Sequence, residues 1–368
     1  MDDRLRVAIT LEQCWHRVPG GTAQSIVELT SALASRSDVR MVGVSARHRQ
    51  PPAEPFRPPI DVRPLALPRP LLYEAWHALR WPPIEQATGP VDVVHATAVA
   101  IPACRAPLVS TIHDLAFLGD ADRATQHGHR FFRRGLELAR RRAALVLCPS
   151  RATMGDCEAA GFDPERLRLV PWGVRVSPVD VAAGERARRA HRLLRPYVLF
   201  VGTAEPRKNL GTLIEGFRSL GNRELDLVLV GPTGWNEDLD ARIAPLGGRA
   251  RRLGFVSATD LPALYAGSAA FCYPSLQEGF GLPVLEAMAH GAPVVTSAGT
   301  ATEEVAGDAA LLADPRDPAT VTAALVRILD EPGLADELRR RGRERAAVYS
   351  WARSAELTAQ AYAEAAGL

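Results

Sequence analysis

The sequence predicts an α/β protein whose strands are parallel and whose helices cover both faces of each sheet. Short apolar runs alternate with amphipathic stretches of helical length along most of the chain, as expected for strands buried on both faces. The alternation occurs in two series of similar size, and 368 residues suffice for two domains. We therefore expect two Rossmann-like, doubly wound halves.

The first series occupies residues 1–176, which we assign to an N-terminal domain. A helix is expected at Ala23–Ala34, after the turn Pro19-Gly20-Gly21-Thr22. The expected strands are Leu5–Thr10, Val42–Ser45, Val91–His95, Val109–Ile112 and Ala144–Cys148.

A proline-rich stretch interrupts this series at residues 51–90, which hold 11 of the 29 prolines. Because proline cannot donate a backbone hydrogen bond to a sheet, we expect a mostly irregular excursion over the surface. Trp76 and Trp81 are expected to anchor it.

The second series follows a polar, arginine-rich segment, residues 177–195, which we interpret as an interdomain linker. We assign residues 196–350 to a C-terminal domain and residues 351–368 to a final amphipathic helix. The expected strands are Tyr197–Val201, Leu225–Val230, Arg252–Phe255, Ala269–Tyr273 and Pro293–Thr296, and the expected helices are Leu210–Leu220, Leu261–Gly267 and Pro283–His290.

Composition excludes several classes of protein. Lys+Arg 44 against Asp+Glu 42 gives a net charge of +2 and no argument for a nucleic-acid partner. The five scattered cysteines form no C-x-x-C pair, which favours reduced thiols over disulfides or zinc. The N-terminus has no apolar signal core, and no apolar run approaches a membrane span. We therefore expect a cytoplasmic protein. Lys208 is the only lysine.

The densest cluster of candidate site residues is the segment Ser275–Gly291, where a strand, a loop and a helix follow one another. In open α/β sheets, ligands bind at the carboxyl ends of strands, which is where Glu278 falls. Glycines 279 and 281 allow a ligand to approach the backbone, and N–H groups at the helix start suit a phosphate. We place Glu286 in the first helical turn, facing the same site. Alternatively, Glu286 is only a favourable helix-dipole acid and Glu278 a solvated loop residue.

A second candidate site follows the strand that ends at Val201. A Gly/Pro turn brings Arg207 and Lys208 to the start of the next helix. Two cations beside unsatisfied N–H donors form a diphosphate site. The alternative is a basic pair on a solvated turn.

Together these two sites resemble the retaining glycosyltransferases of family 4, which have the GT-B fold of two facing Rossmann-like domains. The matching segments are Glu205-Pro-Arg-Lys-Asn-Leu210, Glu278-Gly-Phe-Gly-Leu-Pro-Val-Leu-Glu286-Ala-Met, Gly291-Ala-Pro-Val-Val295 and Glu304-Val-Ala-Gly-Asp-Ala-Ala-Leu311. They cover nearly the whole C-terminal half. The resemblance implies that the final helix from Trp351 crosses back onto the N-terminal domain.

The resemblance also implies roles for individual residues. Lys208, with Arg207, would neutralise the diphosphate of a nucleotide-sugar donor, so that no metal or other cofactor is expected. Glu278 would contact the hydroxyls of the donor sugar and Glu286 those of the ribose. The remaining donor-binding residues of the C-terminal half would be Thr203, Phe255, Val256, Gly279, Phe280, Gly281 and Leu282. Thr203 is a departure, since many relatives have an arginine near this position.

In the N-terminal half the resemblance is thinner. Gly20 and Gly21 resemble the family's glycine loop under the diphosphate, although a plain strand–helix turn would read the same way. His113 would reach the donor sugar near the reaction centre, and Asp114 would support it or touch the acceptor. We therefore expect His113, Asp114, Lys208 and Glu278 to be the catalytic residues. His95 is taken as structural.

We accordingly expect a metal-independent, retaining transfer of a hexosyl unit, favouring mannosyl, from GDP-mannose or next a UDP-sugar. The acceptor would be a glycan, a lipid-linked molecule or a small molecule. The helical stretch His129–Arg142 holds six arginines and could contact the inner face of a membrane, but such a run is more often a solvated helix face. Two D-x-D pairs, Asp120/Asp122 and Asp238/Asp240, do not directly follow an apolar strand, and we assign them no metal.

Three alternatives remain open from the sequence. A nicotinamide dehydrogenase is disfavoured because no G-x-G-x-x-G follows the first strand. A non-hydrolysing sugar-nucleotide epimerase would have the same fold and would convert the donor without an acceptor. A non-catalytic nucleotide-sugar-binding protein would bind without turnover.

Overall fold

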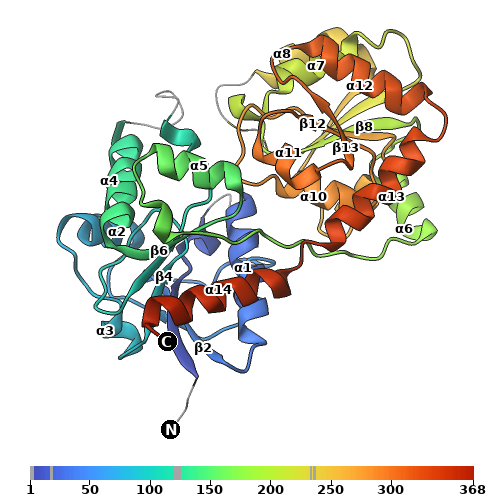
Figure 1. Cartoon of the computed structure of the whole chain (residues 1–368). Helices are drawn as coiled ribbons and strands as arrows, with labels where there is room; N and C mark the ends of the chain where they lie inside the picture. The colour runs from blue at the N-terminus through green and yellow to red at the C-terminus, as the bar shows by residue number, and fades with distance from the viewer. Residues whose placement is uncertain (1–3, 17–19, 119–125, 233, 235–237) are drawn as a thin grey trace. The chain divides into compact units, whose positions relative to one another are not determined.

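The computed structural model describes residues 4–16, 20–118, 126–232, 234 and 238–368. The chain divides into two compact units (Figure 1). Unit 1 comprises Met1–Gly173 together with Ser350–Leu368, and unit 2 comprises Val174–Tyr349. Each unit is an α/β sandwich with its own parallel sheet, as the alternating sequence pattern predicted.

In its described residues, unit 1 contains a seven-stranded sheet in the order β3-β2-β1-β4-β5-β6-β7, with every pairing parallel. The strands are β1 Leu5–Thr10, β2 Val39–Ser45, β3 Val62–Pro64, β4 Val93–Ala96, β5 Leu108–Thr111, β6 Ala143–Cys148 and β7 Leu167–Leu169. The helices are α1 Gly20–Ala34, α2 Arg69–Ala78, α3 Glu85–Thr88, α4 Gln126–Arg142, α5 Arg151–Ala159 and α14 Trp351–Ala366, with short 3₁₀ turns at Glu12–Trp15, Ala116–Leu118 and Pro164–Arg166.

The proline-rich stretch is more regular than predicted, because Pro64 can end a strand and Pro70 can stand at the start of a helix. It contains β3, α2 and α3. Pro70 stands in the first turn of α2, where its missing N–H costs nothing. Trp76 is fully buried and donates to the carbonyl of Pro82 at 3.0 Å, so it anchors the stretch as expected. Trp81 is half exposed and does not anchor the stretch.

The final helix, α14, is part of unit 1. It packs against α1 and against β4, β5 and β6, and its Tyr362 is fully buried. The hydroxyl of Tyr362 lies 2.7 Å from Nδ1 of His95, and Nε2 of His95 lies 2.7 Å from the hydroxyl of Thr111. His95 thus joins the last helix to two strands, in keeping with the structural role predicted for it.

Unit 2 contains a six-stranded parallel sheet among its described residues, in the order β10-β9-β8-β11-β12-β13. The strands are β8 Tyr197–Val201, β9 Asp226–Val230, β10 Ala250–Gly254, β11 Ala270–Tyr273, β12 Val294–Ser297 and β13 Ala310–Ala313. The helices are α6 Val181–Ala190, α7 Leu210–Arg218, α8 Leu239–Ile243, α9 Leu261–Ala266, α10 Leu282–Ala289, α11 Ala301–Ala306, α12 Pro318–Asp330 and α13 Leu334–Ala347, with 3₁₀ turns at Pro206–Lys208 and Ala244–Arg249.

The segment interpreted as a linker is partly helical. Residues 181–190 form α6, which begins at the side-chain cap of Asp180 and packs against α9 of unit 2. Ala187 is buried in this contact. Because α6 buries only Ala187, its other residues are polar and arginine-rich. This composition is also typical of a linker.

Candidate active site

One group of candidate site residues lies where the strand order of unit 2 reverses. Strands β8 and β11 are hydrogen-bonded neighbours, although they are not consecutive in sequence. The crossovers leave in opposite directions on either side of this pair, which opens a crevice at the carboxyl ends of the strands. The loop after β8 carries Arg207 and Lys208, and the loop after β11 carries Glu278. The sheet topology therefore brings together two motifs that are about 70 residues apart.

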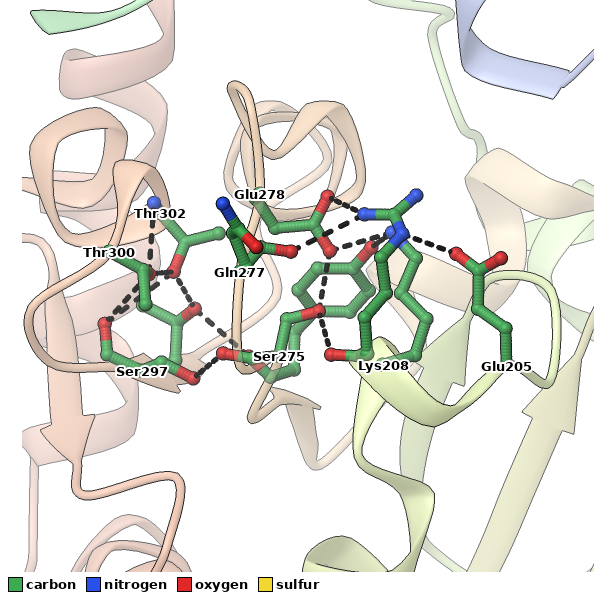
Figure 2. Close-up of polar contacts among 11 residues, drawn as sticks. Glu205, Lys208, Ser275, Gln277, Glu278, Ser297, Thr300 and Thr302 are labelled. Carbon is green, nitrogen blue, oxygen red and sulfur yellow. Dashed lines mark hydrogen bonds and ion pairs between the residues drawn. The ribbon is translucent and has the colours of Figure 1, made fainter. Parts of the chain in front are cut away.

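These loops are joined by a network of ion pairs (Figure 2). Glu278 Oε1 accepts from Lys208 Nζ at 2.6 Å and from Ser275 Oγ at 2.5 Å. Glu278 Oε2 accepts from a terminal nitrogen of Arg207 at 2.9 Å, and Nε of Arg207 lies 2.6 Å from Glu205 Oε1. Both cations predicted to bind a diphosphate are therefore already paired with carboxylates.

Lys208 is buried, with 7% of its surface exposed. Its ammonium donates to Tyr273 Oη at 2.5 Å as well as to Glu278. Burial lowers the pKa of Lys208, and Arg207 lowers it further, against the raising effect of Glu278. Burial alone would raise the pKa of Glu278, but Lys208 and Arg207 outweigh it and hold that pKa at about 2. Glu278 is thus an ionised carboxylate within the fold.

Polar side chains fix the backbone under this network. Ser297 Oγ donates to the carbonyl of Ser275 at 2.7 Å, and Thr296 Oγ1 donates to the carbonyl of Tyr273 at 3.1 Å. Asn209, whose φ is +58°, donates through Nδ2 to the carbonyl of Pro274 at 2.9 Å. The loop is therefore held by strand β12 on one side and by the turn before α7 on the other, and it is preorganised.

Gly281 forms the entry to α10. Its φ is +103°, which only glycine adopts readily. A Cβ at this position would lie 2.7 Å from Cγ2 of Thr302. The glycine that the motif supplies is thus required both by backbone conformation and by close packing against α11.

The other predicted donor residues of unit 2 lie after β8, after β10, in the loop after β11 and in α10. The prediction that Glu286 stands in the first turn of α10 is wrong, because it is the fifth residue of the helix. Its Oε2 accepts from Tyr265 Oη at 3.1 Å. Phe255 is 82% exposed after β10. Val256, Phe280 and Leu282 are buried, and Thr203 is half-buried after β8.

Unit 1 has its own reversal of strand order, between β1 and β4. Thr10 ends β1 and Thr97 follows β4; the hydroxyl of Thr97 donates to the carbonyl of Thr10. Gly20 and Gly21 are exposed in the first turn of α1, so they lie at a helix start as predicted.

His113 lies two residues beyond the end of β5. Its Nε2 donates to the carbonyl of Thr97 at 2.6 Å, which leaves Nδ1 as the acceptor of a neutral ring. Nδ1 is buried and has no hydrogen-bond partner among the residues that the structure describes. Burial lowers the pKa of His113, against the raising effects of the Thr97 carbonyl and Asp114. The ring lines a small cavity of about 20 Å³ beside His95 and Trp172, which has room for about one water.

Asp114 holds the turn after His113, since its Oδ1 accepts from the backbone N–H of Ala116 at 3.1 Å. In the D-x-D pair that the structure describes, both aspartates bind other protein groups. Asp238 caps α8 by accepting from Ala241, and Asp240 pairs with Arg252. Asp120 and Asp122 lie outside the described residues.

Sequence reasoning did not assign roles to two residues of this site. Tyr273 is the last residue of a fully buried strand, and a hydroxyl-bearing aromatic at the carboxyl end of such a strand could have indicated a site residue. Glu205 stands two residues before Arg207 and is buried. A buried carboxylate beside a cation indicates an ion pair.

Two family profiles match the chain. "Glycosyltransferase Family 4" matches residues 19–177, and "Glycosyl transferases group 1" matches residues 195–331. The O-antigen chain mannosyltransferase B of Escherichia coli is 32% identical over 309 residues, covering 80% of each chain. A D-inositol 3-phosphate glycosyltransferase of Salinispora arenicola is 33% identical over 288 residues, covering 70% of this chain and 64% of the relative.

Solved structures share the fold. Anabaena HepE in complex with UDP and glucose superposes with a TM-score of 0.77 at 19% identity, covering 97% of this chain and 99% of HepE. WaaG, a glycosyltransferase involved in lipopolysaccharide biosynthesis, gives 0.73 at 19% identity, covering 98% of this chain and all of WaaG. The fold and the paired motifs define an α/β enzyme of the GT-B class. The chain belongs to the family 4 glycosyltransferases, as the sequence motifs predicted.

Within the part of the chain that the structure describes, no helix combines the length and hydropathy needed to cross a membrane.

Proposed function

We propose that this glycosyltransferase moves a mannosyl unit from a nucleoside-diphosphate sugar to an acceptor hydroxyl, with retention of the anomeric configuration. The observation that carries the proposal is the Arg207–Lys208–Glu278 network at the β8–β11 switch point. Two cations there can stabilise a diphosphate that leaves with negative charge. A carboxylate beside them can accept hydrogen bonds from sugar hydroxyls.

The donor must exchange partners with Glu278. Lys208 and Arg207 are neutralised by carboxylates in this structure, so an incoming diphosphate would replace Glu278 as their counter-ion. Glu278 Oε1 and Oε2 would then turn to the sugar hydroxyls. Through this exchange both cations keep a counter-ion and the Glu278 carboxylate keeps hydrogen-bond donors, which avoids the cost of a buried charge without partners.

A front-face substitution fits the chemistry of the site. The bond between the anomeric carbon and the diphosphate oxygen breaks, and the acceptor oxygen forms a bond to that carbon on the same face. The acceptor proton passes to the leaving diphosphate. A double displacement would need a protein nucleophile at the anomeric carbon. In the arrangement proposed here the Glu278 carboxylate binds the sugar hydroxyls rather than attacking the anomeric carbon, which supports the front-face route.

Lys208 and Arg207 would supply the charge stabilisation, so the reaction would need no metal or other cofactor. GDP-mannose is the favoured donor because relatives include mannosyltransferases of O-antigen chains and other glycans; a UDP-sugar is next, since HepE structures hold UDP-glucose. The acceptor would be a glycan, a lipid-linked molecule or a small molecule. The basic helix α4 could bring unit 1 to the inner face of a membrane in the cytoplasm.

A donor panel tests the proposal. GDP-mannose, UDP-glucose, UDP-N-acetylglucosamine and ADP-glucose are each titrated against thermal unfolding in the presence of excess EDTA. The true donor raises the unfolding temperature in proportion to ligand-linked stabilisation. Transfer to a glycan panel with that donor is then followed by NMR of the new anomeric proton. Absence of any shift, or a product of inverted configuration, would overturn the proposal; conversion of the donor without an acceptor would identify an epimerase.

A further inference from the structure

A second pocket lies in unit 1, at the amino ends of the strands. Its volume is about 550 Å³, and its lining includes Arg80, Arg105 and Arg142. Leu108, the first residue of β5, also lines it. The candidate active-site residue His113 follows the opposite end of the same strand. At about 3.3 Å per residue, five residues separate the two places by roughly 16 Å. The pocket is therefore distinct from the site described above.

Arg80 is held in place by the backbone. Its guanidinium donates to the carbonyls of Trp76 at 3.0 Å and Ile101 at 2.9 Å, and to that of Pro102. Its own φ is +52°, an unusual conformation for a residue with a side chain. These contacts position the cation at the C-terminal end of α2, but neutral carbonyls leave its charge uncompensated.

The two other arginines come from different elements. Arg105 stands in the loop before β5, and Arg142 is the last residue of α4; both are exposed. In the described part of the chain, none of the three pocket arginines forms an ion pair with a carboxylate. The neighbouring arginines of α4 behave differently, since Arg140 and Arg141 both pair with Glu137.

The carboxylate of Glu85 holds the loop that carries Arg105. Glu85 Oε1 accepts from the backbone N–H groups of Arg105 at 2.6 Å and Ala106 at 3.0 Å. Glu85 therefore caps the loop with its carboxylate. The lining of the pocket itself contains three guanidinium groups and no carboxylate among the described residues. Like charges that line one space repel one another, and an anion bound between them removes this repulsion.

We propose that this pocket binds a phosphate ester. Guanidinium groups form bidentate hydrogen bonds with phosphate oxygens, and three of them, from the end of α2, the loop before β5 and the end of α4, surround one space. The volume lies in the range of ligand sites and exceeds that of an inorganic phosphate, so the organic part of the ester has room. The phosphate is presented either by a lipid headgroup or by a free metabolite. The proposal does not depend on the donor or reaction proposed above.

The experiment uses the full chain and three probes. Inorganic phosphate and mannose 6-phosphate are titrated by calorimetry, and vesicles of phosphatidylcholine with phosphatidic acid are tested by co-sedimentation against pure phosphatidylcholine. Arg105→Gln and Arg142→Gln each remove one pocket cation without touching Arg80, whose backbone contacts support the fold. Arg141→Gln is the matched control, because it makes the same change of charge one residue away, outside the pocket. Lys208→Gln reports phosphate that binds at the diphosphate site instead.

We expect at least one phosphate ester to bind about tenfold more weakly to each pocket variant, and unchanged to Arg141→Gln and Lys208→Gln. Binding of mannose 6-phosphate alone identifies a free ester, and binding of phosphatidic acid vesicles alone identifies a lipid headgroup. The proposal is overturned if none of the probes binds. It is equally overturned if the binding is lost in Lys208→Gln rather than in the pocket variants, or falls to the same extent in Arg141→Gln.

Discussion

The hydroxyl of Tyr273 and the ammonium of Lys208 lie 2.5 Å apart, and this contact joins the end of β11 to the turn after β8. The Tyr273 ring is fully buried, so its hydroxyl cannot move away from the ammonium without moving the strand. Tyr273 is therefore a positioning residue for Lys208.

Tyr273→Phe should reduce turnover about tenfold, since a hydrogen bond to a charged group contributes roughly 1.5–3 kcal/mol. Initial rates at saturating donor measure this. Tyr197→Phe is the matched control: this buried tyrosine of β8 donates to the carbonyl of Leu264 at 2.8 Å, outside the network. The two variants should lose similar stability, but only Tyr273→Phe should lose activity. Equal rates in both would show that Tyr273 has no positioning role.

Lys208→Arg should impair transfer although it conserves the charge. The side chain is buried between Tyr273 and Glu278, with Arg207 beside it. A planar guanidinium is larger than an ammonium, and its N–H groups point in different directions, so it cannot make the same hydrogen bonds. Overpacking of a buried position costs about 1–3 kcal/mol. Lys208→Ala should weaken donor binding by roughly 1.5–3 kcal/mol and reduce turnover further. Donor titration and initial rates check both. Arg223→Ala, at an exposed ion pair with Asp330, is the control, and normal turnover in Lys208→Arg contradicts the prediction.

Glu278 should make unit 2 sensitive to acid. Its pKa in the fold is about 2, against an ordinary value of 4.5. Because the folded pKa is depressed, the stabilisation is complete above about pH 4.5 and is lost as the pH falls through 2. The difference between these two pKa values corresponds to roughly 3 kcal/mol of the free energy of unfolding. The free energy of unfolding of the wild type and of Glu278→Gln, from urea titration between pH 7 and pH 3, should converge as the pH falls. A gap that is constant with pH would contradict the assigned pKa.

Gly281→Ala should destabilise the loop more than its backbone conformation alone predicts. An alanine at positive φ costs about 1 kcal/mol, and here its Cβ would also meet Cγ2 of Thr302 at 2.7 Å. Gly299→Ala separates the two effects, because Gly299 has a φ of +72° and open space around its Cβ position. Adding Thr302→Ser removes Cγ2 and should partly restore stability and donor affinity to Gly281→Ala. Failure of this rescue would show that the contact with Thr302 is not the cause.

Unit 1 should lose stability in mild acid for a different reason. Burial, with a smaller effect of His113, lowers the pKa of His95 from 6.5 to about 3. Since the unfolded chain takes up the proton first, the stabilisation is present above pH 6.5 and declines as the pH falls toward 3. At pH 4 the loss from His95 is roughly 3 kcal/mol. Hydrogen exchange of β4 and α14 between pH 7 and pH 4 measures it. The variant His95→Gln, which cannot take up the proton, should show a smaller change over this range than the wild type.

Much of the fold could be predicted because parallel strands carry a strong local signal. Strand β8 was placed to the residue, since its apolar run Tyr197–Val201 is bounded by Pro196 and Gly202. Helix α2 could not be predicted because five prolines stand before or just within it, between residues 58 and 70, and a proline in the first helical turn looks the same in sequence as one in a loop.

The site could be predicted in its residue types but not in its pairings. The motifs identified Lys208 and Glu278, and both are at the switch point. Their direct ion pair depends on the strand order β9-β8-β11-β12, which brings residues together across the sheet and leaves no local signal. The buried position of Tyr273 Oη beside Lys208 depends on the same order.

The chain leaves unit 1 at Gly173 and returns to it at Ser350. Gly173 lies against this return point, because a Cβ there would be 2.1 Å from the backbone nitrogen of Trp351; within unit 2, Val174 N–H donates to the carbonyl of Tyr349 at 3.3 Å. Unit 2 is thus an insertion with adjoining ends. During synthesis, its strands are complete before α14 leaves the ribosome, whereas unit 1 still lacks the helix that covers Val93 and Leu145. Unit 2 can therefore fold first, and unit 1 depends on α14, which is translated after unit 2, to bury its core.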